Sequence, residues 1–158
     1  MAIQKTNVMR ILDSAHIQYN TYTYENKDGA LDGVSVANKI GQPVERVYKT
    51  LVTRGASKNF FIFVIPVSKE LNLKAAAKSV GEKSIEMIRM DEINKVTGYI
   101  RGGCSPIGMK KDYQTVIDSS CENIDFIIFS AGKIGFQVEI EPKELIDFIK
   151  AGVAHIIE

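Results

Sequence analysis

Two neighbouring strand-like segments near the middle of the chain restrict the fold more than any other part of the sequence. Residues 59–67, Asn-Phe-Phe-Ile-Phe-Val-Ile-Pro-Val, are apolar at almost every position. Such a run is typical of a central strand that is covered on both faces. Residues 46–54, Arg-Val-Tyr-Lys-Thr-Leu-Val-Thr-Arg, are rich in β-branched and apolar side chains and precede it across a short turn. We therefore predict a hairpin that lies inside a sheet.

A single lysine, Lys49, stands in the middle of the first of these strands. Because side chains alternate between the two faces of a strand, Lys49 projects on the same side as Val47 and Leu51. Its side chain then either runs along apolar surface until the ammonium reaches water, or holds the ammonium inside a pocket. The residues alone leave both interpretations open, although a central strand makes the first one harder to satisfy.

The rest of the chain mixes hairpins with helices and does not alternate strand with helix. Periodicity and capping residues predict helices that begin at 6–7, 35, 72, 91 and 142. Further strands are predicted at 17–24, 85–88, 116–118, 126–129, 136–140 and, closing the sheet, 154–157, with a loop at 25–33. This order favours an α/β fold of the α+β type: a mixed, largely antiparallel, barrel-like sheet with peripheral helices, in a single domain over residues 1–158.

Charge and cysteine content exclude several classes of protein. The formal net charge of +1 argues against binding of nucleic acid over the whole surface, although lysines and arginines can still line one local groove. Cys104 and Cys121 form no CxxC pair, so neither a disulfide framework nor a zinc site is indicated, and we expect no metal. The sequence has no secretory signal and no apolar run of ~20 residues, so we expect a cytoplasmic protein without a membrane segment.

Two glycine-rich turns are able to approach a ligand closely. Residues 97–111 contain four of the twelve glycines and end in two lysines, and residues 130–135 read Ser-Ala-Gly-Lys-Ile-Gly. Glycine lets the backbone come near a ligand and leaves amide hydrogens exposed. Each segment is equally compatible with a merely tight turn.

No ordinary catalytic constellation is evident in the sequence. His16 follows the first predicted helix and His155 lies almost at the C-terminus, so neither is placed beside a nucleophile. Cys104 is a candidate nucleophile by its local context, but no base accompanies it. A lysine in an apolar setting and glycine amides could instead stabilise the developing oxyanion of an activated ester whose nucleophile belongs to the substrate.

Several motifs resemble one known family when they are taken together and in order. They are Val47-Tyr48-Lys49-Thr50-Leu51-Val52, Pro66-Val67 with Glu70-Leu71-Asn72-Leu73-Lys74, Thr97-Gly98-Tyr99, Gly102-Gly103-Cys104-Ser105-Pro106 with Gly108 and Lys110-Lys111, and Ser130-Ala131-Gly132. Over nearly the whole chain, they are similar to the YbaK type of aminoacyl-tRNA deacylase. The resemblance implies the editing-domain fold shared with prolyl-tRNA synthetase and trans-editing hydrolysis of Cys-tRNA(Pro), extending to Cys-tRNA(Cys).

The resemblance also implies how the reaction proceeds and what takes part in it. No cofactor is expected, because in that family the thiol of the substrate's own cysteine attacks the ester carbonyl and releases a cyclic thioester. The partners implied are the 3′ end of an aminoacylated tRNA and prolyl-tRNA synthetase, with the protein itself a monomer or weak dimer.

By the same resemblance, Lys49 is the main functional residue and holds the terminal adenosine end of the substrate. Gly102 and Gly103 are expected to line the pocket and to offer amides beside it. The substrate-binding residues implied are Tyr24, Thr50, Ser130 and Gly132, of which Gly132 is a third glycine of the pocket wall.

One departure from the family pattern concerns Gln137, near which the family often carries an aspartate. This difference leaves the amino-acid preference open, because related editing domains remove alanine. Two alternatives therefore stand beside a cysteine deacylase: a deacylase of another small amino acid such as alanine, and a binding module for a nucleotide or an aminoacyl-adenosine without catalysis. A hydrolase that uses Cys104 as its nucleophile is a third.

Overall fold

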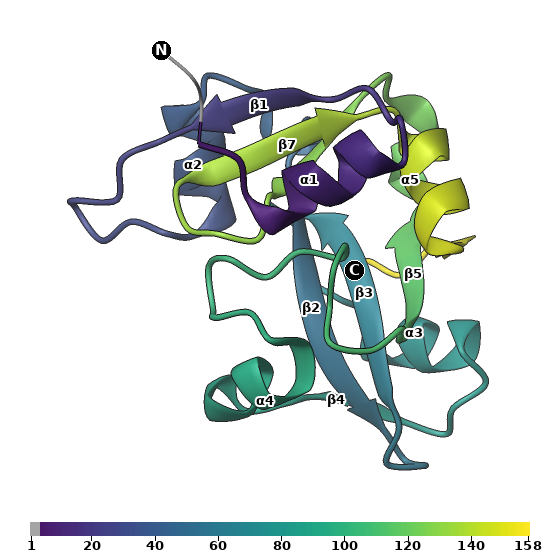
Figure 1. Cartoon of the computed structure of the whole chain (residues 1–158). Coiled ribbons are helices and arrows are strands. Elements are labelled where there is room, and N and C mark those ends of the chain that lie inside the picture. Colours follow the sequence, from purple (N-terminus) through teal and green to yellow (C-terminus); the bar gives the residue numbers. More distant parts are fainter. Residues whose placement is uncertain (1–3) are drawn as a thin grey trace.

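The structure is a computed structural model that describes residues 4–158 (Figure 1). These residues form α1 (Asn7–Ser14), α2 (Gly33–Lys39), α3 (Leu73–Ser79), α4 (Ile93–Thr97) and α5 (Pro142–Ile149). The strands are β1 (Asn20–Thr23), β2 (Tyr48–Gly55), β3 (Phe60–Pro66), β4 (Ile85–Met87), β5 (Gln114–Asp118), β6 (Ile127–Ser130), β7 (Phe136–Ile140) and β8 (Gly152–Ala154). No helix among residues 4–158 is long and apolar enough to cross a membrane.

The strands are arranged in two sheets. One has the order β1-β7-β6 and is antiparallel, and the other has the order β4-β2-β3-β5-β8 and is mixed. The predicted hairpin is confirmed, because β2 and β3 pair antiparallel with Lys49 opposite Ile65. An isolated parallel bridge between Val47 and Ile128 joins the sheets where β2 begins. The mixed, largely antiparallel fold with peripheral helices is confirmed, although residues 4–158 form two open sheets and no closed barrel.

Local sequence explains most helix starts. The side chain of Thr6 accepts a hydrogen bond from the Met9 amide, and that of Asn72 accepts one from the Ala75 amide, as the predicted caps require. α2 begins at Gly33, two residues before the predicted start at Ser35. The reason is that the Asp32 carboxylate accepts hydrogen bonds from both the amide and the hydroxyl of Ser35 and so caps the helix earlier.

Two strands begin later than the sequence predicts. β2 begins at Tyr48 because residues Val44–Arg46 form a 3-10 turn directly before it. β1 begins at Asn20 because the backbone at His16 turns with a φ of 59° and Ile17 packs into the core. The closing strand predicted at 154–157 lies earlier in the chain, as β8, which ends at Ala154 and pairs parallel with β5. Later in the predicted range, Ile157 forms only an isolated bridge with Leu71.

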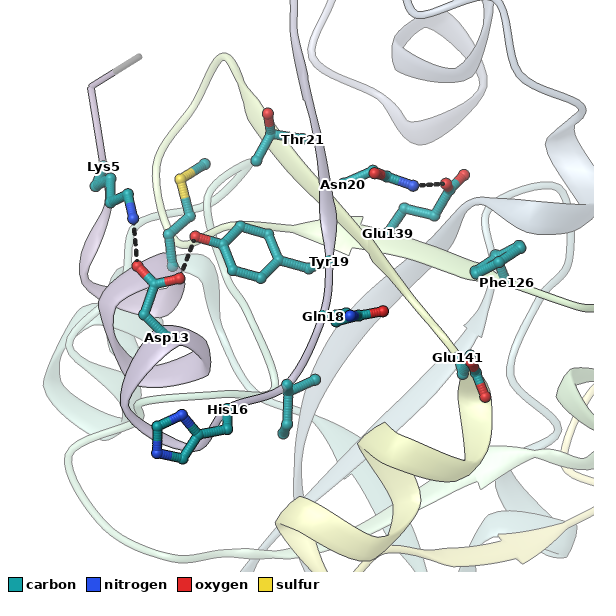
Figure 2. Close-up of a pocket in the computed structure, with 12 residues that line it drawn as sticks. Lys5, Asp13, His16, Gln18, Tyr19, Asn20, Thr21, Phe126, Glu139 and Glu141 are labelled. Carbon is teal, nitrogen blue, oxygen red and sulfur yellow. Dashed lines mark hydrogen bonds and ion pairs between the residues drawn. The ribbon is translucent and has the colours of Figure 1, made fainter. Parts of the chain in front are cut away.

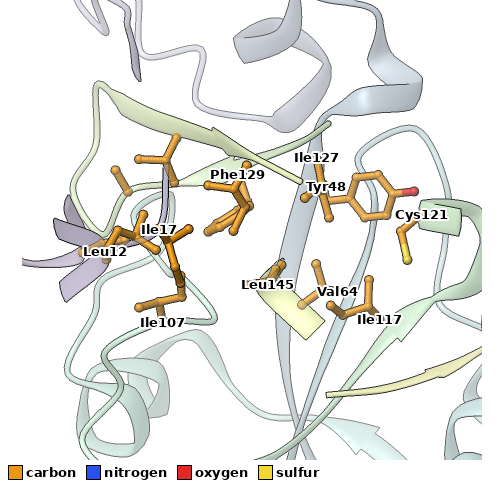
Figure 3. Packing of buried hydrophobic residues seen from close by; sticks show 14 of the residues in the cluster. Leu12, Ile17, Tyr48, Val64, Ile107, Ile117, Cys121, Ile127, Phe129 and Leu145 are labelled. Atoms are coloured by element: carbon orange, nitrogen blue, oxygen red, sulfur yellow. The ribbon is translucent and has the colours of Figure 1, made fainter. Parts of the chain in front are cut away.

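The main core holds these parts in fixed positions (Figure 3). Leu12 of α1, Phe129 of β6 and Leu145 of α5 are completely buried and meet in one cluster. Burial of each such side chain is worth about 1.5–3 kcal/mol. Tyr48 belongs to the same cluster, and its hydroxyl lies 2.6 Å from that of Ser120. The residue directly before Lys49 is therefore anchored in the core.

Candidate functional site

A small cavity lies at the junction of the two sheets. Its walls come from the start of β2, the ends of β6 and β7 that lie beside it, α2, and the loops around Tyr24 and Gly102. Its volume is about 110 Å³. The lining residues are Tyr24, Leu31, Gly33, Val36, Val47, Tyr48, Lys49, Thr50, Val67, Gly102, Cys104, Ser130 and Gln137. Five of the seven predicted site residues are thus brought together.

Lys49 is the one charged side chain among the residues that line this cavity. It is partly buried, and Val47 and Tyr48 directly before it are at most 2% exposed. Within residues 4–158 its ammonium forms no ion pair with any carboxylate. The cavity therefore carries an uncompensated positive charge, which favours an anionic group or a developing negative charge.

Two hydroxyl groups at the same cavity lack hydrogen-bond partners. Tyr24 Oη and Thr50 Oγ1 are buried, and neither finds a partner within residues 4–158. A buried polar group without a partner costs about 1–3 kcal/mol, and native proteins contain few of them. That both occur at one cavity, next to Lys49, indicates hydrogen-bonding positions that a bound ligand would fill.

The three predicted glycines do not play one common part. Gly102 lines the cavity with a φ of 86°, which few other residues adopt. The Gly103 amide donates to the carbonyl of Ile100 at 3.0 Å, and the Gly132 amide donates to Ser130 Oγ at 3.1 Å. Neither Gly103 nor Gly132 lines the cavity, and both of their amides already have acceptors. Of the three predicted glycines, only Gly102 is therefore placed to offer an amide to a ligand in the cavity.

Close packing explains why glycine is needed at the other two positions. A Cβ on Gly103 would lie 3.3 Å from the amide nitrogen of Ile134, and one on Gly132 would lie 3.0 Å from both Tyr99 and Val8. These glycines let the two turns pack against each other and against α1. Their contribution to the cavity is to position Gly102 and Ser130.

Gln137 lies in the cavity wall, opposite Ser130 in the β6–β7 pair, and is 5% exposed. Because its side chain is a neutral amide, Gln137 leaves the charge of Lys49 unbalanced.

Sequence reasoning missed the wall that α2 contributes through Gly33 and Val36. The one clue to this wall in the local sequence was the glycine at position 33. The structure shows why it is glycine, because a Cβ there would lie 2.2 Å from Val67 Cγ1.

Cys104 also lines the cavity, but its thiol is poorly suited to act as a nucleophile. Burial raises its pKa to about 11. At pH 7 only about one thiol in ten thousand would then be ionised. His16 and His155 do not line the cavity, and residues 4–158 contain no group of three or more His, Cys, Asp or Glu side chains placed to hold a metal ion.

A larger hollow of about 820 Å³ lies elsewhere, beside α1 and β1 (Figure 2). Several of its polar groups already bind one another: Asp13 accepts from Lys5 and from Tyr19, and Glu139 accepts from Asn20 at 3.0 Å. Because Asp13 and Glu139 already have partners in the protein, they offer a ligand less than the unpartnered hydroxyls of the small cavity do.

Comparison with known proteins agrees with the geometry. The family model described as "Aminoacyl-tRNA editing domain" matches residues 29–148. The chain is 40% identical, over 97% of its length and 93% of the relative's, to the Enterococcus faecalis protein named "Putative Cys-tRNA(Pro)/Cys-tRNA(Cys) deacylase EbsC". It is 32% identical to the proline–tRNA ligase of Trichlorobacter lovleyi over 59% of this chain and 16% of the ligase.

A solved structure confirms the fold. The crystal structure named "putative trans-editing enzyme for prolyl tRNA synthetase" superposes with a TM-score of 0.82 at 20% identity, covering 99% of both chains. The resemblance expected from the sequence motifs is confirmed by these matches. The chain belongs to the aminoacyl-tRNA editing domain family.

Proposed function

We propose that this protein is a trans-editing aminoacyl-tRNA deacylase that hydrolyses the ester of mischarged Cys-tRNA(Pro), and also of Cys-tRNA(Cys). Membership of the editing family and 40% identity to a relative named for this activity support the reaction. The observation that carries the proposal is the pair of unpartnered buried hydroxyls, on Tyr24 and Thr50, in one cavity with Lys49. These groups are the hydrogen-bonding and charged contacts that a polar ester end requires.

The size of the cavity supports a small amino acid as cargo. Its volume of about 110 Å³ is well below the ~300–1,000 Å³ of pockets that enclose whole drug-sized ligands. It is the volume that only a few water molecules occupy in the liquid, at ~30 Å³ each. A cysteinyl or alanyl group fits such a space, whereas the terminal adenosine must stay largely outside it. Lys49, in the wall, then acts on the ester that joins the two.

The proposed reaction needs no base from the protein. The positive charge of Lys49 favours the thiolate form of the substrate's cysteine and stabilises the oxyanion that forms when this sulfur attacks the ester carbonyl. A carbon–sulfur bond forms, the ester carbon–oxygen bond breaks, and the ribose oxygen leaves with the proton from the thiol. The cyclic thioester then adds water and yields free cysteine. The role of the protein is to hold the substrate's thiol and its ester carbonyl in the geometry of attack.

Prolyl-tRNA synthetase is the proposed partner, in the cytoplasm where tRNA is charged. A segment of a proline–tRNA ligase that makes up 16% of that enzyme matches 59% of this chain. The matched part of this chain therefore corresponds to a segment of that ligase, and we propose that this protein acts on tRNA that a prolyl-tRNA synthetase has mischarged.

The proposal is tested by release of amino acid from tRNA(Pro) and tRNA(Cys) charged with Cys, Ala, Ser or Pro. We expect Cys to be released from tRNA(Pro) at least about tenfold faster than Pro, since an oversized or differently shaped group loses more than about 1.4 kcal/mol in a cavity of this size. Faster release of Ala than of Cys would instead indicate an alanine deacylase, and would connect that preference with Gln137. Tight binding without release of any amino acid would contradict the proposal and favour a binding module.

Replacement of Cys104 by alanine is expected to leave kcat/KM for Cys-tRNA(Pro) within about threefold of the wild-type value. The reason is that a thiol with a pKa of about 11 is protonated at the pH of the assay and takes no part in the attack. A matched control is Cys121→Ala, since Cys121 is buried in the main core and lines no part of the cavity. Loss of activity in the folded Cys104 variant alone would mean that the protein supplies the nucleophile.

A further inference from the structure

Another concave surface is lined in part by the end of the 98–111 loop. It has a volume of about 400 Å³, and its lining includes Arg89, Lys95, Lys110 and Lys111 beside Phe60 and Tyr113. We call this surface the cationic groove. Four cationic side chains line it against the single carboxylate of Glu92, although the net charge of the whole chain is only +1.

The three lysines of the cationic groove are the uncompensated charges. Glu92 is engaged by Arg54 at 2.5 Å, and Arg89 lies 3.2 Å from Asp91. In contrast, Lys95, Lys110 and Lys111 are exposed, and none of them forms an ion pair within residues 4–158. The charge that remains available in the groove is therefore positive.

The fold places two of these lysines next to each other. Lys110 Nζ donates to the backbone carbonyl of Lys95 at 3.4 Å. The stem of Lys110 crosses Gly98, where a Cβ would lie 3.2 Å from Lys110 Cγ. The Lys110 ammonium is therefore held at the backbone of Lys95, in a part of the groove whose positive charge a bound polyanion would offset.

An ordered apolar floor lies below these charges. The rings of Phe60 and Tyr113 meet edge to face at 6.0 Å, and the Tyr113 hydroxyl donates to the carbonyl of Val96 at 2.6 Å. Because that hydroxyl is engaged by the protein, the polar groups left for a ligand are the ammonium groups on the rim. Lysine ammonium groups suit phosphate contacts, in which each acts as a point charge.

One loop connects the groove to the small cavity. Cys104 lines the cavity and Lys110 lines the groove, and the two are six positions apart in the chain. Even fully extended, this segment spans at most about 20 Å. A stacked nucleic-acid strand rises about 3.4 Å per nucleotide, so a strand whose end occupies the cavity reaches the groove within about six nucleotides.

We propose that the cationic groove binds backbone phosphates of the acceptor end of the tRNA whose terminal aminoacyl group enters the small cavity. This inference rests on the proposed function for its substrate. RNA is favoured over an acidic protein surface because the small cavity already requires a nucleic-acid end within the reach of the 98–111 loop. Phosphate contacts of this kind carry no base sequence, so the proposed contribution of the groove is to affinity and orientation.

The first test is binding of uncharged full-length tRNA to the variant Lys95→Gln/Lys110→Gln/Lys111→Gln. We expect its Kd to rise by about tenfold or more at 0.1 M salt, and the slope of log K against log salt to become shallower by about 2–3. The matched control is Lys74→Gln/Lys78→Gln/Lys83→Gln, which removes the same charge from exposed positions on and after α3. The slope of log K against log salt for this control should differ from the wild-type slope by less than about one, which corresponds to the loss of one phosphate contact. Equal slopes for wild type and groove variant would overturn the inference, even if the protein hydrolyses nothing.

The second test compares full-length Cys-tRNA(Pro) with cysteinyl-adenosine, which is too short to reach the groove. The groove variant should lose about tenfold or more in kcat/KM on the tRNA and stay within about twofold of wild type on the adenosine ester. Equal losses on both substrates would mean a damaged cavity, and would overturn the groove's role. Unchanged kinetics with tRNA alone, but lost stimulation by prolyl-tRNA synthetase, would assign the groove to a protein partner. If the wild type cleaves neither substrate, the proposed function fails while the binding test still decides the groove.

Discussion

Replacing Lys49 with alanine is expected to lower kcat/KM for Cys-tRNA(Pro) by about 100-fold or more. Lys49 is the only charged residue that lines the cavity, and no carboxylate within residues 4–158 pairs with it. Removal of one group that stabilises a developing oxyanion commonly costs a factor of about 10²–10³. The measurement is initial release of cysteine from charged tRNA at subsaturating substrate.

The same variant should remain folded, which separates its effect from a loss of stability. Because the Lys49 ammonium forms no ion pair within residues 4–158, its removal breaks no such contact there, and Tm should change by no more than about 4 °C. Lys74→Ala, at an exposed position on α3, is the control for loss of one positive charge. Full activity of Lys49→Ala, or equal losses in both variants, would contradict the assignment.

The sequence predicted the parts of this fold whose determinants are local. β3 reads as a central strand because residues 61–65 must be apolar on both faces, and they are at most 5% exposed. The helix caps at Thr6 and Asn72 depend on a hydrogen bond to an amide three residues later, which a short motif encodes. The start of β2 was misplaced because Arg46, which can also begin a strand, closes the 3-10 turn Val44–Arg46.

The cavity itself was only partly predictable, because contacts between distant segments create it. Val47 and Ile128 are joined by the bridge at the junction of the sheets, and no local pattern records that pairing. Glycines show the same limit: the motif containing Gly102 and Gly103 indicates close approach, but not whether a ligand or another turn approaches. In the structure Gly102 meets the cavity, whereas Gly103 meets the turn at Ile134.

The second large effect concerns the unpartnered hydroxyls, and it has opposite signs for stability and for activity. In Thr50→Val and Tyr24→Phe, the buried oxygen that lacks a partner is removed, so the free energy of unfolding should stay constant or rise by about 1–2 kcal/mol. The same changes should lower kcat/KM for Cys-tRNA(Pro) by about tenfold or more each, because a hydrogen bond to the substrate worth about 1.5 kcal/mol or more is lost. Denaturant unfolding and cysteine release measure the two effects on the same samples.

A neighbouring threonine on the same strand supplies the matched control. Thr53 is fully buried, and its hydroxyl donates to the carbonyl of Phe61 at 2.8 Å, so the protein itself uses this hydrogen bond. Thr53→Val should therefore destabilise the protein by about 1 kcal/mol and leave kcat/KM of the folded enzyme unchanged. Thr50→Val should do the reverse, since its hydrogen bond is made only with substrate bound. If Thr50→Val destabilises the protein as Thr53→Val does and keeps its activity, the Thr50 hydroxyl serves the fold, and the cavity loses one of the two contacts on which its assignment depends.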